Sequence, residues 1–244
     1  MKRITLNERK ESATMKVADI FAVLFFIFLA ALVFFFPFGP CGWCGIDIAG
    51  SCSGDLTGLK NFGALVNKFP YISGFLKVAI LATFGEMIKT RGRTGSYKTD
   101  DLFLKFVVWG LYGMLFTLVF ALFAQGIAAL SGTPVWPFKV DNCWNTLIFA
   151  FSTSFWLNII FCYPMMLSHE WFNTCIKNKR FIGGTEFIKG LDAHAWGSFL
   201  PKSIIVFWVP AHTITFCLPP DYRILMSAFL SLALGFILTI KPKH

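Results

Sequence analysis

The cysteines are the residues of this chain whose spacing could do redox chemistry. Cys41 and Cys44 form a Cys-x-x-Cys pair, Cys52 follows shortly after them, and Cys143 comes much later. A Cys-x-x-Cys spacing lowers the pKa of the attacking thiol and supports thiol–disulfide exchange. Because four is an even number, the same cysteines on an oxidising face would also permit two structural disulfides. Structural bridges and a redox pair, with Cys52 and Cys143 as its exchange partners, are therefore the two interpretations.

Polar residues inside otherwise apolar runs form the second group that could do chemistry. They are Lys77, Glu86, Gln125, Asn158 and His212. A charge in hydrocarbon is costly, so such residues mark solute pathways unless they reach the interface or bond to a neighbouring helix. At about 100° per residue, Lys77 and Glu86 point to opposite sides of one helix. Lys89, one turn beyond Glu86, is a candidate partner for its carboxylate. We predict that these five polar residues line a pore or a polar interior.

Motifs for other kinds of chemistry are missing from the sequence. The segment 91–95, Arg-Gly-Arg-Thr-Gly, lacks the spacing of a phosphate-binding loop, and no His-Glu-x-x-His pattern occurs. The cysteine-containing loop offers no histidine as a zinc ligand. We therefore predict no catalytic residue, no metal site and no cofactor.

Long apolar runs must position these residues. A hydrocarbon core about 30 Å thick needs roughly 20 apolar residues in a helix. Six stretches are apolar enough, and nearly all long enough: Ile20–Phe36, Tyr71–Ile88, Leu102–Leu130, Trp144–Met166, Ser198–Cys217 and Tyr222–Ile240. The predicted fold class is an all-α polytopic membrane helix bundle of about six transmembrane helices.

The basic residues predict the orientation of this bundle. The chain has a net charge of +9, and most of its 22 Lys and Arg residues fall in the N-terminus, the second and fourth connections and the C-terminus. Six spans place all four of these segments on one side, and basic segments stay in the cytoplasm. Both termini are therefore predicted to be cytoplasmic, and the charge pattern argues for a lipid bilayer and against nucleic acid as the partner.

Three regions follow from this reading. Residues 1–16 form a cytoplasmic arm, residues 17–61 hold the first transmembrane helix and the cysteine-containing extracytoplasmic loop, and residues 62–244 hold the rest of the bundle. The first apolar stretch has no small-residue cleavage site, so we interpret it as a retained helix. Asp101, or Asp100 before it, is a plausible N-cap for the helix that begins at Leu102.

Three short segments of residues 62–240 resemble one protein family. The first runs from Pro70-Tyr71 to Gly85-Glu86, the second is Tyr112-Gly113 with Thr117, and the third is Trp208-Val209-Pro210 with His212, Thr215, Pro220 and Arg223. They resemble the P-x-x-T … L-x-x-x-G-D, Y-G-x-x-x-T-G-P and W-x-P-x-Q-x-x-N … P-x-x-x-R patterns of the 22-kilodalton peroxisomal membrane protein and its inner-mitochondrial relatives. The chain departs from these patterns at Glu86, His212 and Thr215, which stand where the family has Asp, Gln and Asn. The Gly-Pro after Thr117 is also absent, and the spacing from Pro220 to Arg223 is one residue short.

The resemblance implies a small-solute pore, because members of that family have been described as non-selective pores. By analogy the residues that matter are Gly85, Glu86, Tyr112, Gly113, Trp208, Pro210 and Arg223. We therefore expect a small-solute pore or transporter-like protein, for an unknown solute, and a homo-oligomer is compatible with it. The alternatives are a membrane thiol–disulfide oxidoreductase using Cys41 and Cys44, or a non-catalytic membrane-organising protein. Outward cysteines and the charge bias favour a bacterial cytoplasmic membrane, with an organellar membrane as the alternative.

Overall fold

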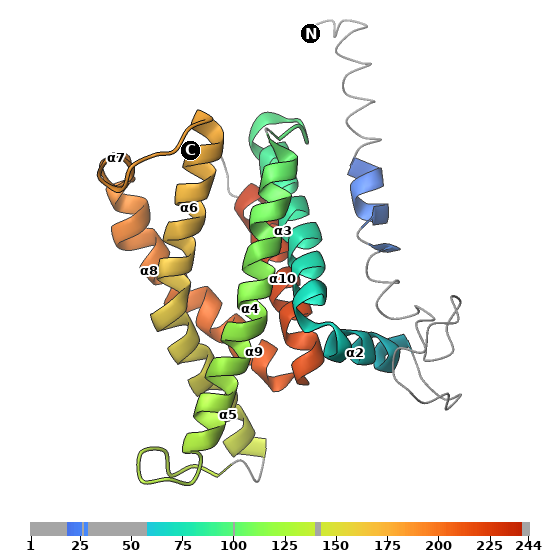
Figure 1. Ribbon diagram of the computed structural model, residues 1–244, viewed down its shortest axis with the longest axis vertical. Helices are drawn as coiled ribbons and strands as arrows, with labels where there is room; N and C mark the ends of the chain where they lie inside the picture. Colours follow the sequence, from blue (N-terminus) through green and yellow to red (C-terminus); the bar gives the residue numbers. More distant parts are fainter. Residues whose placement is uncertain (1–18, 26, 29–57, 100, 140–142, 241–244) are drawn as a thin grey trace, which may run out of the picture. The chain divides into compact units, whose positions relative to one another are not determined.

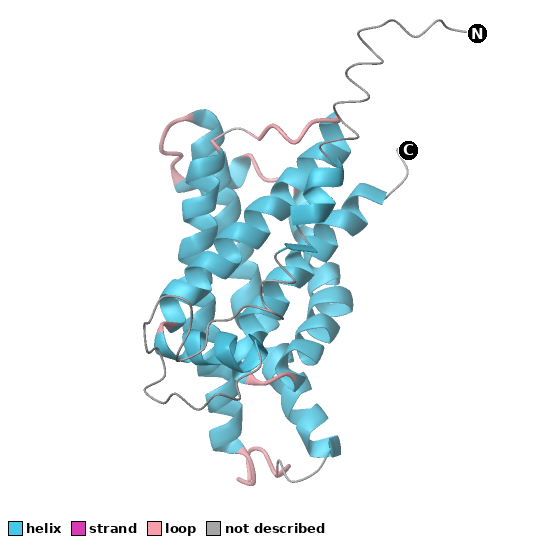
Figure 2. Cartoon of the chain, turned by 90° about the vertical axis from the view of Figure 1, so that its right-hand side faces the viewer, coloured by secondary structure: helices cyan, strands magenta, loops and turns pink. Residues whose placement is uncertain are grey.

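The computed structural model describes residues 19–25, 27–28, 58–99, 101–139 and 143–240. In these residues the regular structure is helical, and two isolated bridges in the turn at 131–136 are the exceptions. Figure 2 shows this arrangement of helices joined by loops. The predicted all-α class is therefore confirmed for the described part of the chain.

The chain divides into two compact units, Met1–Pro70 with Thr90–Lys98, and Tyr71–Lys89 with Thr99–His244. The first unit holds α2 (Gly58–Lys68) and the last turn of α3 (Pro70–Thr94). Within it, the guanidinium of Arg91 donates to both carboxylate oxygens of Asp19 at 2.9 and 3.0 Å, and the Tyr97 hydroxyl donates to the same carboxylate at 2.8 Å. Gly95 ends α3 with φ +78°, a left-handed conformation that glycine adopts without steric cost.

The second unit holds most of the helices (Figure 1). They are α4 (Leu102–Leu130), α5 (Cys143–Leu157), α6 (Tyr163–Asn178), α7 (Gly184–Lys189), α8 (Leu200–Ser203), α9 (Val209–Cys217) and α10 (Pro220–Ile240), with the π-helical turns η1 (Asn158–Cys162), η2 (Ala195–Phe199) and η3 (Ile204–Trp208) between them. Helix α9 packs against both α5 and α10, and α4 contacts α5, α6 and α10. The start of α4 and the end of α6 lie at one end of this unit, and the turn between α4 and α5 lies at the other.

Four helices in the described residues are long and apolar enough to cross a membrane: Pro70–Gly92, Leu102–Leu130, Trp144–Asn178 and Ala195–Cys217. They match the predicted second to fifth spans, although the third of these helices continues well past Met166, where the prediction ended it. Helix α10 covers the predicted sixth span. Of the predicted first span, residues 20–25, 27 and 28 are described, and they are helical. The count of six spans stays a prediction.

Each π-helical turn is followed by a proline. Pro164, Pro201 and Pro210 each stand at the second residue after η1, η2 and η3, respectively. Proline has no N–H group, and its ring clashes with the carbonyl four residues earlier in an α-helix. A π turn widens the backbone at that point, so the ring fits without breaking the helix. These prolines therefore change the helix type locally and do not end the helix.

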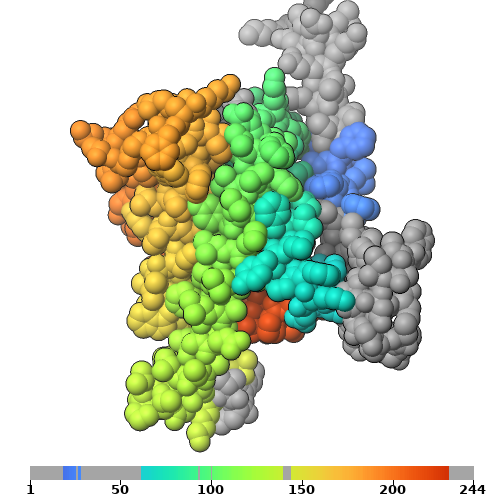
Figure 3. Space-filling model, viewed as in Figure 1, coloured from blue at the N-terminus to red at the C-terminus, as the bar shows by residue number. Residues whose placement is uncertain are grey.

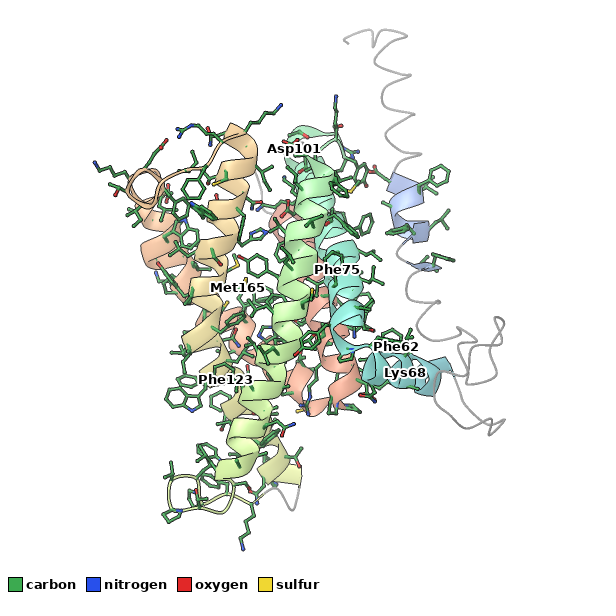
Figure 4. The ribbon with its side chains drawn as sticks, viewed as in Figure 1. Phe62, Lys68, Phe75, Asp101, Phe123 and Met165 are labelled. Carbon is green, nitrogen blue, oxygen red and sulfur yellow. The ribbon has the colours of Figure 1, made fainter. Side chains whose placement is uncertain are left out.

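Glycines bring α3 and α4 into backbone contact. A Cβ atom at Gly113 would lie 2.2 Å from the carbonyl oxygen of Gly74, and one at Gly74 would lie 2.2 Å from the Thr117 hydroxyl. Gly110 faces the ring of Phe75, which is labelled in Figure 4, and that ring also meets Phe106 edge-on. Small residues allow such close helix crossings in membranes. Gly126 has no neighbour of this kind and lies exposed.

Candidate functional site

A buried network of polar side chains joins η1, α9 and α10. The Nδ2 and Oδ1 atoms of the Asn158 amide lie 3.0 and 3.1 Å, respectively, from Nδ1 of the His212 ring. The other ring nitrogen, Nε2, lies 3.3 Å from the Ser227 hydroxyl. Asn158 also donates to the backbone carbonyl of Ser154 at 2.8 Å, and the Ser154 hydroxyl donates to the carbonyl of Val209 at 2.7 Å. The network therefore links η1 to the consecutive helices α9 and α10, and Asn158 and His212 are 54 residues apart in the sequence.

The residues of this network are shielded from solvent. Asn158 and Ser154 have no exposed surface, and His212 and Ser227 retain 7% and 6%. The rings of Trp208 and Phe120 lie 5.3 and 5.6 Å from the imidazole centroid. A buried polar group without a hydrogen bond would cost about 1–3 kcal/mol. The mutual bonding of these groups explains how they are accommodated in an apolar bundle.

The network can hold either neutral form of the imidazole. In one form, Asn158 Nδ2–H donates to His212 Nδ1, and Nε2–H donates to Ser227. In the other, Nδ1–H donates to Asn158 Oδ1, and the Ser227 hydroxyl donates to Nε2. Both forms use the heavy-atom positions observed. The same partners therefore satisfy both ring nitrogens of His212 in either neutral tautomer.

A second polar cluster lies around Glu86, where α3, α4 and α6 meet. The Glu86 carboxylate accepts a hydrogen bond from Trp109 Nε1 at 2.8 Å and forms an ion pair with Lys105 Nζ at 3.2 Å. His169 Nε2 lies 3.6 Å from the same carboxylate, and the imidazole stacks on the Trp109 ring at 4.1 Å between centroids. The candidate partner for Glu86 was Lys89, which is exposed. Lys105 of the neighbouring helix forms the ion pair with this carboxylate.

His169 is held from its other side as well. Its Nδ1 atom lies 3.3 Å from the Asn173 amide nitrogen, one turn later on α6. If this amide donates, Nδ1 accepts and the ring proton lies on Nε2, which faces Glu86. The Tyr112 hydroxyl bonds to the Ser168 hydroxyl at 2.6 Å next to the same ring. The cluster thus combines the carboxylate of Glu86, the ammonium of Lys105 and the imidazole of His169, next to the aromatic side chains of Trp109 and Tyr112.

The structure separates the other predicted polar residues from these clusters. Lys77 is buried, with 8% of its surface exposed, and Asp221 in the first turn of α10 acts on it electrostatically. Lys77 and Glu86, which share α3, therefore have different electrostatic partners. Gln125 lies on the exposed face of α4. Of the five predicted residues, the structure brings together Asn158 and His212.

The residues that match the family patterns lie at contacts between helices and at helix ends. Gly85 is buried on α3, Gly113 contacts α3, and Tyr112 borders His169. Trp208 and Pro210 flank the start of α9 beside His212. Arg223 donates to the carbonyls of Leu218 and Phe216 at the end of α9, at 2.9 and 3.3 Å.

The cysteine predictions lie largely outside the described residues. Cys41, Cys44 and Cys52 are not described, and of Cys143 only the backbone, at the start of α5, is described. Cys162, Cys175 and Cys217 are free thiols in the described part of the chain. Cys175 Sγ accepts a hydrogen bond from the backbone N–H of Ile182 at 3.4 Å, which gives this residue a local structural role.

Sequence reasoning did not select Ser154, Ser227, Lys105, Trp109 or His169 as site residues. Serines are common in helices, so Ser154 and Ser227 carry no signal of their own. His169 lies beyond the predicted end of the fourth span, although the apolar and aromatic residues Trp171, Phe172 and Ile176 continue the pattern. Following that pattern would have extended the helix past His169. No group of three or more His, Cys, Asp or Glu residues able to hold a metal occurs in the described residues.

Comparisons of the chain with family models, curated proteins and solved structures found no match. Within the described residues, the sequence and fold define a helical protein with four segments able to cross a membrane.

Proposed function

We propose that this chain is an integral membrane protein that passes a small polar solute through its helix bundle, as a pore or a transporter. The observation that carries the proposal is the buried Asn158–His212–Ser227 network. Polar groups buried in a membrane bundle are costly, and transporters place such groups along their solute or ion pathways. Three helical segments contribute to the network, so a movement of any one of them changes its hydrogen bonds.

The proline-linked π turns support a bundle that can rearrange. Asn158 is the first residue of η1, and His212 follows η3 by one turn, so both network residues lie next to a widened stretch of backbone. The turns η1 and η3 also contact each other. Interrupted helices in membrane transporters surround their binding sites in the same way. Bending at these turns would let the network release one partner and accept a solute.

The charged residues and the family resemblance support the same proposal. Lys77 and the Glu86–Lys105 pair place charge inside helices that are otherwise apolar enough to cross a membrane. The resemblance to the 22-kilodalton peroxisomal membrane protein family implies passage of small solutes. We extend this property to the present chain as part of the proposal.

Solute flux in proteoliposomes tests the proposal directly. The purified chain is reconstituted, and the entry of small sugars, amino acids and ions is followed by vesicle swelling and by planar-bilayer conductance. We expect flux from the wild type, a loss of at least tenfold in His212→Phe and Asn158→Leu, and unchanged flux in Gln125→Leu, whose side chain lies on the exposed face. His212→Gln keeps hydrogen-bonding capacity and should recover part of the flux, which separates a role in transport from a loss of folding.

A second variant tests the charge within the bundle. Lys77→Glu should shift the cation-to-anion selectivity of any conductance, because it reverses a buried charge. Wild-type vesicles that are silent to every solute and show no conductance would overturn the proposal. The membrane-organising alternative would then be favoured.

A further inference from the structure

The connection after α6 combines exposed apolar side chains with a cluster of basic ones. Residues 177–190 contain four basic residues and one acidic residue. Lys177, Lys179, Arg180 and Lys189 are all exposed. Phe181 and Ile188 are 76% and 66% exposed beside them. We call these six residues the basic platform; Figure 3 shows the part of the surface, drawn in orange, to which this segment belongs.

The platform has a defined shape because two buried residues of the same segment anchor it. Ile182 and Phe187 are buried, with 2% and 7% of their surface exposed. The Trp171 indole donates to the backbone carbonyl of Ile182 at 2.8 Å, and its ring lies 5.2 Å from that of Phe181. The loop between α6 and α7 is thus fastened to α6 through Ile182. Phe181 is exposed next to this contact, and Ile188 is exposed on α7 next to the buried Phe187.

Two further contacts fix the basic residues. Lys179 ends α6 with φ +52°, and the backbone N–H of Arg180 bonds to the Cys175 carbonyl at 3.3 Å, which turns the chain sharply at the helix end. Arg180 forms an ion pair with Glu186 across the loop. The Arg180–Glu186 ion pair does not include the other three basic residues of the platform, Lys177, Lys179 and Lys189.

The length of the helix places the platform near lipid headgroups. The helix Trp144–Asn178 has 35 residues. At 1.5 Å per residue this is about 50 Å, so it extends past a hydrocarbon core of about 30 Å. Exposed aromatic and aliphatic side chains surrounded by lysines are typical of segments that lie at the interface of an anionic leaflet.

We propose that the basic platform binds the anionic headgroups of the membrane leaflet, with Phe181 and Ile188 inserted among the upper acyl chains. The lysines supply charge complementarity to phosphate groups, and the two apolar side chains require the hydrocarbon boundary. A protein partner would be the alternative occupant of the same surface. The proposal stands independently of whether the bundle transports a solute.

Lipid retention by the full chain tests the proposal. The protein in detergent is titrated with phosphatidylglycerol or with phosphatidylcholine of the same acyl chains, and bound lipid is counted by native mass spectrometry. Each basic residue near the surface contributes about fivefold to the binding of anionic lipid. We expect Lys177→Gln/Lys179→Gln/Lys189→Gln to reduce phosphatidylglycerol affinity on the order of a hundredfold. The control Lys68→Gln/Lys139→Gln removes two exposed lysines from the side predicted to lie opposite the platform and should reduce the affinity by less than about fivefold.

A second experiment tests whether Phe181 and Ile188 insert into the membrane. In anionic proteoliposomes, Phe181→Ser/Ile188→Ser should speed amide hydrogen exchange across residues 179–190 at least threefold relative to the wild type, because the loop leaves the interface. Equal loss of phosphatidylglycerol in the two lysine variants would overturn the proposal. So would equal affinity of the wild type for the two lipids, which would instead favour a protein partner for this surface.

Discussion

Arg223 fulfils a structural need at the end of α9, where the last carbonyl groups of a helix have no partner in their own helix. Its guanidinium donates to the carbonyls of Leu218 and Phe216 and lies 5.3 Å from the centroid of the Phe216 ring. The planar group reaches two acceptors and one aromatic face at once, and a lysine has no such fork. A residue of the family-like motif therefore has a role in the structure that requires no contact with solute.

We predict that Arg223→Gln lowers the free energy of unfolding by about 1–3 kcal/mol, because it leaves helix-end carbonyls without donors. Arg223→Lys should recover less than half of this loss. Unfolding of the detergent-solubilised chain, followed by circular dichroism, measures both. The control Lys202→Gln, at an exposed position, should remain within about 0.5 kcal/mol of the wild type. Equal effects of Arg223→Gln and Lys202→Gln would contradict the assigned role.

The Arg180–Glu186 ion pair predicts a pH dependence for the loop before α7. The Arg180 guanidinium lowers the pKa of Glu186 below its ordinary value of 4.5. A carboxylate with a lowered pKa stabilises the folded loop above that ordinary value, and the stabilisation is lost as the pH falls through the lower, folded value. Hydrogen exchange of residues 180–186, corrected for intrinsic rates, should therefore accelerate as the pH falls below about 4.5. Glu186→Gln should remove this pH dependence, and a wild-type loop whose corrected exchange is flat down to pH 3 would rule the prediction out.

At the scale of elements, the crossing of α3 and α4 depends on the absence of side chains. A methyl group at Gly113 would have to displace backbone atoms of Gly74, which are themselves part of a helix. The same substitution at Gly126 meets no neighbour. Both glycines lie on α4, so they form a matched pair in one helix.

We predict that Gly113→Ala separates α3 and α4 and destabilises the protein by about 1–3 kcal/mol or more, as overpacking does. Gly126→Ala should be neutral or stabilising by up to about 1 kcal/mol, because alanine is the better helix former. Thermal unfolding of the two variants in the same detergent gives the comparison. Similar midpoints for both would show that the close crossing does not contribute to stability.

At the scale of the whole molecule, the charge pattern predicts which segments share a side of the membrane. The start of α4 and the connection between α6 and α7 lie at the same end of their unit, opposite the turn between α4 and α5 (Figure 1). This agrees with the alternation that the basic residues predict. The prediction of six spans would place the two termini on the same side of the membrane as the α6–α7 connection.

Protease protection of epitope tags measures this arrangement. Tags at the N-terminus, at the C-terminus and at Gly183–Gly184 should be cleaved from the same side of sealed vesicles. A tag in the exposed turn at Pro134–Val135 should be cleaved from the other. Termini on opposite sides would require an odd number of spans and would refute the six-span topology.

The sequence by itself determined the helices and their apolar character. Spans such as Leu102–Leu130 could be found because length and hydropathy are local properties of consecutive residues. The N-cap position of Asp101 was also predicted, although its side chain makes no capping bond and its backbone is left-handed, with φ +50°. The sequence also predicted two of the residues that meet in the interior, Asn158 and His212.

The tertiary structure alone decided which of these residues meet. The partners of Glu86 are Lys105, Trp109 and His169, which lie on two other helices, and no local pattern specifies that pairing. The direction of His212 toward Asn158 depends on the rotation of α9 about its axis. The π turn before Pro210 changes that rotation, because its i→i+5 hydrogen bonds shift every later side chain relative to an uninterrupted α-helix. Sequence periodicity assumes an uninterrupted α-helix, so it identified the polar residues but did not predict their partners.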